Sequence, residues 1–424
     1  MAYPPIVPSA LADRIDAAVA ALEPQLIAWR RDLHANPELG NREFRTAALV
    51  AEHLRQLNFD EVSTGVAHTG VVGLLKGGRP GPVLALRADM DALPVTEEVD
   101  LPFASKARAM WNGEEVGVMH ACGHDVHTAN LMGVAQVLAG LRGEICGTLK
   151  FIFQPAEEMP PEGEQGGAKM MVAEGVMDNP KPIAVLGLHI TSRLPVGVVG
   201  YRPGPTMSSA DSFKITVTGR QTHGAYPWLG VDPIVTAAQV VLGLQTVVSR
   251  TQDITHEPAV VTIGAIKGGV RENIIPESVE MRGTIRSFDE GMRDDIHERV
   301  TYLAEAIARG SRAGCNVCIT KNYPVTVNDP ELTQALLPSL ARVAGADKLV
   351  LVPKAMGSED FSYFQREAPG LFFFVGVTPE GVEPGKSAPN HSPRFYVDER
   401  CLVVGTRALA QLGCDFLQAM AGAD

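Results

Sequence analysis

The chain has 424 residues, 45% of them hydrophobic and 20% charged, and its formal net charge is −12 at pH 7. This length predicts two domains, or one domain with an insertion, and the composition is typical of a soluble globular protein. The acidic balance and the lack of any Lys/Arg run argue against a nucleic-acid or membrane partner, and no run of 18 apolar residues indicates a membrane span.

The first half of the chain predicts alternating helices and apolar strands. The first twenty residues have no continuous apolar core, so they predict neither a signal peptide nor an anchor. Amphipathic periodicity predicts helices over 12–33, 42–57 and 129–141. Short apolar runs predict strands over 71–75, 83–87, 147–153 and 184–189. Because these strands lack polar alternation, they fit a sheet that is buried on both faces.

Near residue 207 the pattern changes to strands that alternate between apolar and polar residues. Strands are predicted over 211–219, 259–266, 277–287 and 315–323. Helices are predicted over 232–250 and 290–309, the first with an aspartate N-cap followed by proline. The resulting β-α-β-β-α-β order is that of a ferredoxin-like unit.

Beyond this insertion the sequence predicts helices over 331–344 and 398–420 and an apolar strand over 370–377. The predicted fold class is α/β. A catalytic domain over 1–206 and 324–424 is built on a buried mixed sheet, and an inserted α+β domain covers 207–323. Six cysteines in so long a chain do not indicate a disulfide framework, which favours a cytoplasmic location. We interpret Cys315 and Cys318, on opposite faces of one predicted strand, as buried thiols.

The densest cluster of metal-binding side chains lies at 120–127. A thiol with several imidazoles suits a borderline metal ion such as zinc. Cys122 and His124 follow a glycine-rich approach to a predicted helix and are well placed to converge on an ion. For His120 and His127, a ligand role and a core role are equally open.

The adjacent carboxylates Glu157 and Glu158 follow about thirty residues later. One of two such neighbours can bind a metal while the other takes a proton from water, which predicts a hydrolase. His189, at the end of a predicted strand, and His391, in a loop, are further candidates. The ligand set suits two ions with one bridging group: Cys122, His124, Glu158, His189 and His391.

Two aspartates, Asp89 and Asp91, stand at the carboxyl end of the strand predicted over 83–87. Their spacing of two places both on one side if the strand continues. They are either a turn-forming acidic pair or carboxylates that orient a metal ligand from behind. Both interpretations are open.

The assembled motifs resemble one family of dinuclear metal-dependent amidohydrolases, which includes hippurate hydrolase, N-acetyldiaminopimelate deacetylase and plant auxin-conjugate hydrolases and is related to aminoacylases and zinc carboxypeptidases. The match runs in order over 30–399. Its motifs are RRDLH at 30–34, PELG at 37–40, RADMDALP at 87–94, HACGHD at 120–125, QPAEE at 154–158, GSEDF at 357–361 and NH at 390–391.

This resemblance implies a catalytic α/β domain and a ferredoxin-like lid that also forms a homodimer. It assigns the five ligands named above, and it makes Glu157 the general base. More distant relatives carry His-x-Asp where this chain has Asp89 and Asp91. The resemblance therefore implies that Asp91 supports the metals and that Cys122 is the bridging ligand, and it leaves the role of Asp89 open.

The resemblance also implies three residues of the lid. His223, in GRQTHGAYP at 219–227, would donate to the oxyanion from the partner subunit, and Asn273 would be a second donor. Arg286 could hold a substrate carboxylate as a bidentate partner or be a solvated strand arginine, and both interpretations are open.

The leading hypothesis is an amidase that cleaves small N-acyl amino acids to a carboxylate and a free amino acid. The alternatives are a dipeptidase or carboxypeptidase, and a metal-stabilised dimeric binding protein without catalysis. The expected cofactor is two divalent ions, with zinc favoured and manganese, cobalt or nickel as alternatives. The acyl group, the side chain and the stereochemistry of the substrate stay open.

Overall fold

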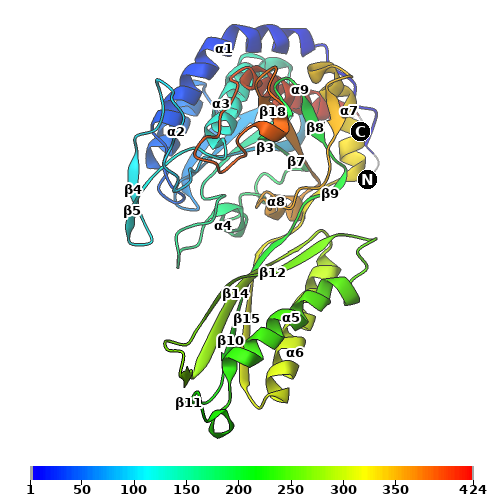
Figure 1. Ribbon diagram of the computed structural model, residues 1–424. Coiled ribbons are helices and arrows are strands. Elements are labelled where there is room, and N and C mark those ends of the chain that lie inside the picture. The colour runs from blue at the N-terminus through cyan, green and yellow to red at the C-terminus, as the bar shows by residue number, and fades with distance from the viewer. Residues whose placement is uncertain (1–2, 423–424) are drawn as a thin grey trace. The chain divides into compact units, whose positions relative to one another are not determined.

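The protein, seen in a computed structural model that describes residues 3–422, divides into two compact units (Figure 1). The first comprises the described parts of 1–204, 327–353 and 363–424, and the second comprises 205–326 and 354–362. The sequence prediction left 354–362 outside the second unit. It belongs there because Met207 pairs with Ala355, and because the Ser208 N–H donates to the carbonyls of Ala355 and Gly357. The catalytic and lid roles of these units remain predictions.

An eight-stranded mixed sheet forms the centre of the first unit, in the order β1-β2-β6-β3-β7-β18-β8-β17. The four central strands β6, β3, β7 and β18 run parallel, whereas β1 and β2 are antiparallel to their neighbours. The predicted buried mixed sheet is thus confirmed. The strand bounds are β1 Glu61–Val66, β2 Gly70–Lys76, β3 Arg79–Asp89, β6 Cys146–Gln154, β7 Ala184–Pro195, β8 Val199–Tyr201, β17 Leu349–Leu351 and β18 Gly370–Thr378.

Helices of the first unit pack on this sheet (Figure 1). α3 (His124–Gly140) and α9 (Cys401–Ala421) contact β3, β6 and β7, and α1 (Ala12–Ala35) packs on both helices. α2 (Phe44–Gln56) packs on β1 and β2, and α7 (Pro330–Ala344) packs on α9. The remaining short elements are β4 Arg108–Trp111, β5 Glu114–Gly117, α4 Gly167–Ala173 and, where the two units join, β9 Gly204–Met207, β16 Thr326–Asn328 and α8 Ser362–Glu367.

The second unit is a four-stranded antiparallel sheet in the order β12-β14-β10-β15, with α5 and α6 packed on it. Its chain order, β10-α5-β12-β14-α6-β15, is the one that the sequence predicts for a ferredoxin-like unit. A separate two-stranded ribbon pairs β11 with β13. The bounds are β10 Ala210–Thr218, β11 Thr222–His223, α5 Pro233–Thr251, β12 Ala259–Gly268, β13 Ile274–Ile275, β14 Ser278–Ser287, α6 Glu290–Gly310 and β15 Gly314–Tyr323.

Within residues 3–422, α5 is the one helix that is long and apolar enough, by length and composition alone, to cross a membrane, with a mean hydropathy of 1.2. A core helix of a soluble protein passes the same test, so this is weak evidence for a span. α5 buries Ala237, Val240 and Leu244 in the core of the second unit.

Cys315 and Cys318 lie on opposite faces of β15, as their spacing predicts. The prediction that both are buried is wrong, because Cys315 is half-buried and Cys318 is exposed. Cys315 is on the face of β15 that packs against the core of the second unit, together with Val317 and Ile319, whereas Cys318 is on the other face.

A buried ion pair ties α6 to β10. Arg293 Nε and Nη2 donate to the two carboxylate oxygens of Asp211 at 2.8 and 2.5 Å, and His297 Nε2 lies 2.7 Å from Asp211 Oδ2. Burial alone would raise the pKa of Asp211, but its hydrogen bonds to Arg293 and His297 hold that pKa below its ordinary value. Arg293 and His297 therefore stabilise the negative charge of Asp211 within the second unit.

Asp211→Ala should lower the free energy of unfolding by about 3–5 kcal/mol, because it removes the buried carboxylate that accepts two hydrogen bonds from Arg293 and leaves this guanidinium with only the partly exposed Glu290. Asp294→Ala is the matched control, since Asp294 follows Arg293 on α6 and forms an exposed pair with Lys321 of β15. That loss should be at most about 1 kcal/mol. Chemical denaturation measures both, and equal losses would contradict the importance of the buried pair.

Candidate metal centre and active site

The candidate site lies at the carboxyl ends of parallel strands in the first unit. β3 ends at Asp89, β6 ends shortly before Glu157 and Glu158, and β7 carries His189. The prediction that His189 ends its strand is wrong, because β7 continues to Pro195. Open α/β sheets commonly bind ligands at this edge.

The ligand atoms of the predicted metal-binding residues lie close enough to share ions. They form three groups within which all ligand atoms are within 4.8 Å of one another: Cys122 with His124 and His189, Cys122 with Glu158 and His391, and His124 with Glu157 and Glu158. Cys122 is common to the first two groups, as a bridging thiolate between two ions would be. The groups bring together all five residues that the sequence predicts as ligands.

A sharp turn brings Cys122 and His124 into the cluster. α3 begins at His124, five residues before its predicted start, and Gly123 precedes it with a φ of +97°. A Cβ on Gly123 would also lie 2.2 Å from the Ile190 side chain of β7. Only glycine fits this turn, both for its backbone conformation and for its close approach to the strand.

Asp91 orients two candidate ligands. Its Oδ1 lies 3.1 Å from His124 Nδ1, and its Oδ2 accepts the backbone N–H of Glu158 at 2.9 Å. The buried Nε2 of His124 has no hydrogen-bond partner among the described residues. With the proton on Nδ1, the lone pair of Nε2 faces the cluster and is available to a metal. This geometry favours the orienting role of Asp91 over a turn-forming pair.

His189 and His391 complete the cluster. The Nδ1 of His189 lies 2.6 Å from the carbonyl oxygen of Ile190, which leaves Nε2 directed at Cys122 Sγ, 3.3 Å away. The Nε2 of His391 lies 3.0 Å from Glu158 Oε1, yet this buried oxygen has no partner of hydrogen-bond geometry within 3–422. Two side chains that bind the same ion would have their ligand atoms at such a short distance without a hydrogen bond between them.

The electrostatics of the cluster fit a cation. Burial, followed by the negative charges of Glu158 and Glu157, raises the pKa of the Cys122 thiol well above its ordinary value. The thiolate that binds metal is therefore disfavoured unless a positive ion is present. A divalent cation would stabilise this thiolate and would also give His124 Nε2, which makes no hydrogen bond to the described residues, a ligand role.

Asp89 belongs to a buried network that adjoins the candidate ligands, because its Oδ2 lies 3.6 Å from His124 Nε2. Arg87 Nη1 donates to its Oδ2 at 2.7 Å, and His127 Nδ1 lies 2.6 Å from its Oδ1. The Nε2 of His127 accepts the N–H of Ile190 at 2.9 Å. Both ring nitrogens of His127 are thus occupied, which favours its core role over a ligand role. Asp89 connects β3 through His127 to the strand that carries His189.

His120 stands apart from the ligand groups. It is buried, and neither ring nitrogen has a hydrogen-bond partner in the described part of the chain. Burial lowers its pKa to about 4, so the ring is neutral near pH 7. Of its two open roles, this environment favours the core residue.

The sequence interpretation missed Glu43, a fully buried carboxylate that precedes α2. Burial, and then the negative charge of Asp91, raises its pKa to about 8. A glutamate before a helix ordinarily indicates an exposed residue that favours the helix N-terminus. No pattern in the sequence separates Glu43 from such residues.

In the second unit, His223 and Asn273 are neighbours at the β11–β13 ribbon. The Gly224 N–H donates to the Asn273 carbonyl at 2.7 Å. The exposed His223 ring accepts the Ala225 N–H at Nδ1, at 3.0 Å. This bond places the ring proton on Nε2, which is then a hydrogen-bond donor.

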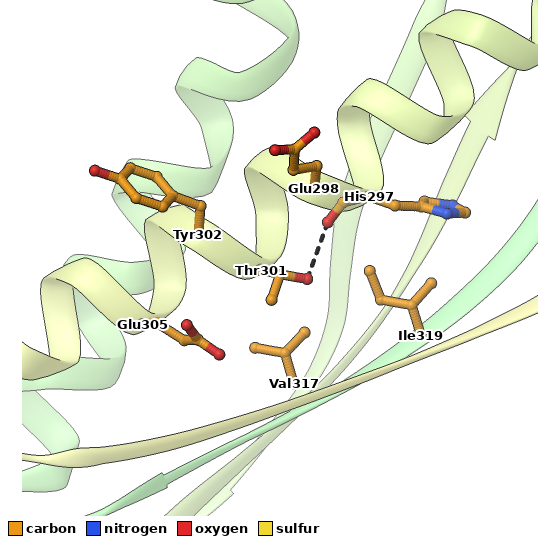
Figure 2. Close-up of a pocket in the computed structure, with 7 residues that line it drawn as sticks. All are labelled: His297, Glu298, Thr301, Tyr302, Glu305, Val317 and Ile319. Atoms are coloured by element: carbon orange, nitrogen blue, oxygen red, sulfur yellow. Dashed lines mark hydrogen bonds between the residues drawn. The ribbon is translucent and has the colours of Figure 1, made fainter.

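Arg286 lies on β14 of the same unit, where its Nη1 donates to Ser358 Oγ at 3.0 Å. It is half-buried, and burial lowers its pKa, so it is not simply a solvated arginine. A separate surface hollow between α6 and β15 contains none of the predicted site residues (Figure 2). Its lining residues are His297, Glu298, Thr301, Tyr302, Glu305, Val317 and Ile319.

Comparisons with known proteins match nearly the whole chain. Residues 85–413 match the profile described as Peptidase family M20/M25/M40. The chain is 41% identical over 408 residues to thermostable carboxypeptidase 2 of Saccharolobus solfataricus, covering 96% of this chain and 99% of that protein. It is 37% identical over 398 residues to N-acetylcysteine deacetylase of Bacillus subtilis, covering 94% and 98%. A solved dinuclear metal binding peptidase of the M20 family from Bacillus subtilis has a TM-score of 0.78 at 34% identity, covering 94% of this chain and 99% of that one.

Cys122→Ser should weaken the binding of divalent metal by more than about tenfold, because it removes the thiolate that two ligand groups share. Cys315→Ser and Cys318→Ser are matched controls that should keep the wild-type metal content. Elemental analysis after dialysis gives the number of ions per chain. Equal loss from all three variants would contradict the assignment of Cys122.

Proposed function

Because the chain belongs to the peptidase family M20/M25/M40, it is a hydrolase of amide or peptide bonds, and we propose that it cleaves N-acyl amino acids. The products would be a carboxylate and a free amino acid. The observation that carries the hydrolytic part of this proposal is the pair of a buried Glu157 and a partly buried Glu158 beside the ligand cluster. The 37% identity to an N-acetylcysteine deacetylase supports an N-acyl amino acid as the substrate. The six free cysteines support the proposed cytoplasmic location.

The proposed cofactor is a pair of divalent ions. A thiol with several imidazoles favours zinc, and manganese, cobalt or nickel could take its place. When bound, such ions lower the pKa of a water molecule and polarise a carbonyl oxygen. The residues that would hold them are Cys122, His124, Glu158, His189 and His391.

In this proposal Glu157 is the general base. It takes a proton from the attacking water and later returns that proton to the leaving nitrogen. The Nε2–H of His223 and the side-chain amide of Asn273 would donate to the oxygen on which negative charge develops. Arg286 would hold the carboxylate of the amino-acid part of the substrate.

A second candidate function is exopeptidase activity, because the protein that is 41% identical over nearly the whole chain is named a carboxypeptidase. A dipeptide is itself an N-acyl amino acid, so both activities would use the same residues. The difference between them lies in the acyl group that the site accepts.

Glu157→Gln should lower kcat by about 10²–10⁴-fold with its metal content unchanged, because the amide cannot accept the proton. Glu115→Gln, at an exposed glutamate paired with Arg108, is the control and should keep wild-type kcat. The assay compares kcat/KM for N-acetyl amino acids, N-benzoyl amino acids and dipeptides. A preference for dipeptides would favour the exopeptidase, and near-normal turnover by Glu157→Gln would exclude Glu157 as the base.

We further propose a homodimer that forms through the second unit, with His223 acting in the site of the partner. Two features support this interface. β12 and β15 are open edges of the sheet, and apolar side chains on β12 and α5 are exposed: Ile266 is 55% and Leu242 is 71% exposed. Edge strands of two copies can pair about a two-fold axis. The second unit, which two segments of the chain form, would close on substrate as a rigid body.

Mixing inactive Glu157→Gln with inactive His223→Ala subunits should restore activity, because a mixed dimer would contain one site with both residues intact. Mass spectrometry of differently labelled subunits verifies that exchange has taken place. Proven exchange without any recovery would place His223 in its own subunit's site or outside the mechanism.

A further inference from the structure

Glu43 lies behind the Glu157–Glu158 pair. It is 0% exposed, and both of its carboxyl oxygens are occupied. Oε1 accepts the backbone N–H of Ala156 at 2.8 Å, and Oε2 accepts the hydroxyl of Thr69 at 2.5 Å. Ala156 is the residue directly before Glu157, so Glu43 holds the backbone from which the proposed base projects.

The backbone at Ala156 needs such support. Its φ is +49°, in the left-handed region that residues with a Cβ rarely adopt and that typically costs about 1–3 kcal/mol. The segment before Glu43 also covers this turn closely, because a Cβ on Gly40 would lie only 3.1 and 3.2 Å from the Cβ and Cα of Ala156. Without its hydrogen bond, Ala156 can relax toward the right-handed region and redirect Glu157.

The two glutamates have separate supports. The backbone N–H of Glu158 is held by Asp91, which also orients His124. The turn that leads into Glu157 is held by Glu43 through Ala156. A loss at Asp91 should therefore affect metal binding, whereas a loss at Glu43 should affect the position of the base.

We propose that Glu43 is a positioning residue, which fixes the left-handed turn at Ala156 and thereby aims Glu157 at the attacking water. This inference rests on the proposed function in one respect, namely that Glu157 is the general base. This role needs only an oxygen at position 43 that accepts the backbone N–H of Ala156, and it does not need a negative charge. Glutamine has the same shape and the same acceptor, so Glu43→Gln should be tolerated.

Asp415 provides a matched control for a purely structural carboxylate. It is 1% exposed, and like Glu43 it accepts one backbone N–H, from Ser9 at 2.7 Å, and one hydroxyl, from Ser339 at 2.5 Å; it also accepts the side-chain amide of Gln411 at 2.7 Å. None of its partners belongs to the ligand cluster. Asp415→Ala thus reports what the loss of such a buried carboxylate does to the fold alone.

The test compares Glu43→Ala, Glu43→Gln and Asp415→Ala as metal-loaded, full-length proteins. Glu43→Ala should lower kcat by about 10–100-fold, the scale expected for a misplaced catalytic group, with KM and the number of ions per chain unchanged. Glu43→Gln should restore most of kcat, and Asp415→Ala should keep the wild-type kcat. Hydrogen exchange in a peptide covering 154–158 should accelerate in Glu43→Ala and not in Asp415→Ala.

Wild-type kcat in Glu43→Ala, a loss of kcat that follows metal loss, or a failure of Glu43→Gln to restore kcat would overturn the inference. If Glu43→Ala does not fold, Thr69→Val removes the hydroxyl at Oε2 instead. It should lower kcat severalfold and accelerate exchange in 154–158, and wild-type values of both would overturn the inference. If the wild-type enzyme cleaves no N-acyl amino acid, the proposed function fails. Hydrogen exchange needs no substrate, so it still tests whether the hydrogen bond from Ala156 to Glu43 stabilises the turn.

Discussion

The first unit depends on one electrostatic constraint, the burial of several acidic groups at one edge of its sheet. Asp91, Glu157 and Glu158 converge there with the thiol of Cys122 and the rings of three histidines. Anionic groups that share a dry site repel one another and lose their hydration, so such a cluster needs positive charge. A pair of divalent cations would resolve this conflict, and it would turn a thiol with a raised pKa into a ligand.

The same constraint explains the shell of buried partners behind the ligands. Each ring must present one particular nitrogen to the cluster, and a hydrogen bond to its other nitrogen fixes this choice. Asp91 does so for His124, and the carbonyl of Ile190 does so for His189. His127 and Asp89 connect β3 to the backbone of β7 at Ile190. The ligand geometry is thus a property of the packed strand ends rather than of separate side chains.

The sequence predicted the long elements, and it identified candidate ligands that lie close together in the fold, because both leave a local signal. Periodicity over ten or more residues identified the main helices of both units, and the cluster of Cys122 and His124 stood out by composition alone. Strands of three residues such as β8 and β17 were missed, since so short a run has no period. The roles of Glu43 and Asp89 were beyond prediction for another reason. Each depends on a partner that the fold brings from elsewhere, Ala156 for the first and His127 for the second.

The hydrolytic groups act on the amide that N-acyl amino acids and peptides share, so they do not select between these substrates. Selection therefore belongs to the residues that surround the acyl group. The loop 159–165 is a candidate for this selection, because it directly follows Glu158 in the chain. It is held against the segment before α2, because Glu164 accepts hydrogen bonds from Asn41 and Arg42. A contact with one methylene group contributes only about 1–3 kcal/mol to discrimination. Small changes in such a loop can therefore alter substrate specificity while the ligand cluster stays the same. This agrees with the finding that a carboxypeptidase and a deacetylase are both related to this chain over most of its length.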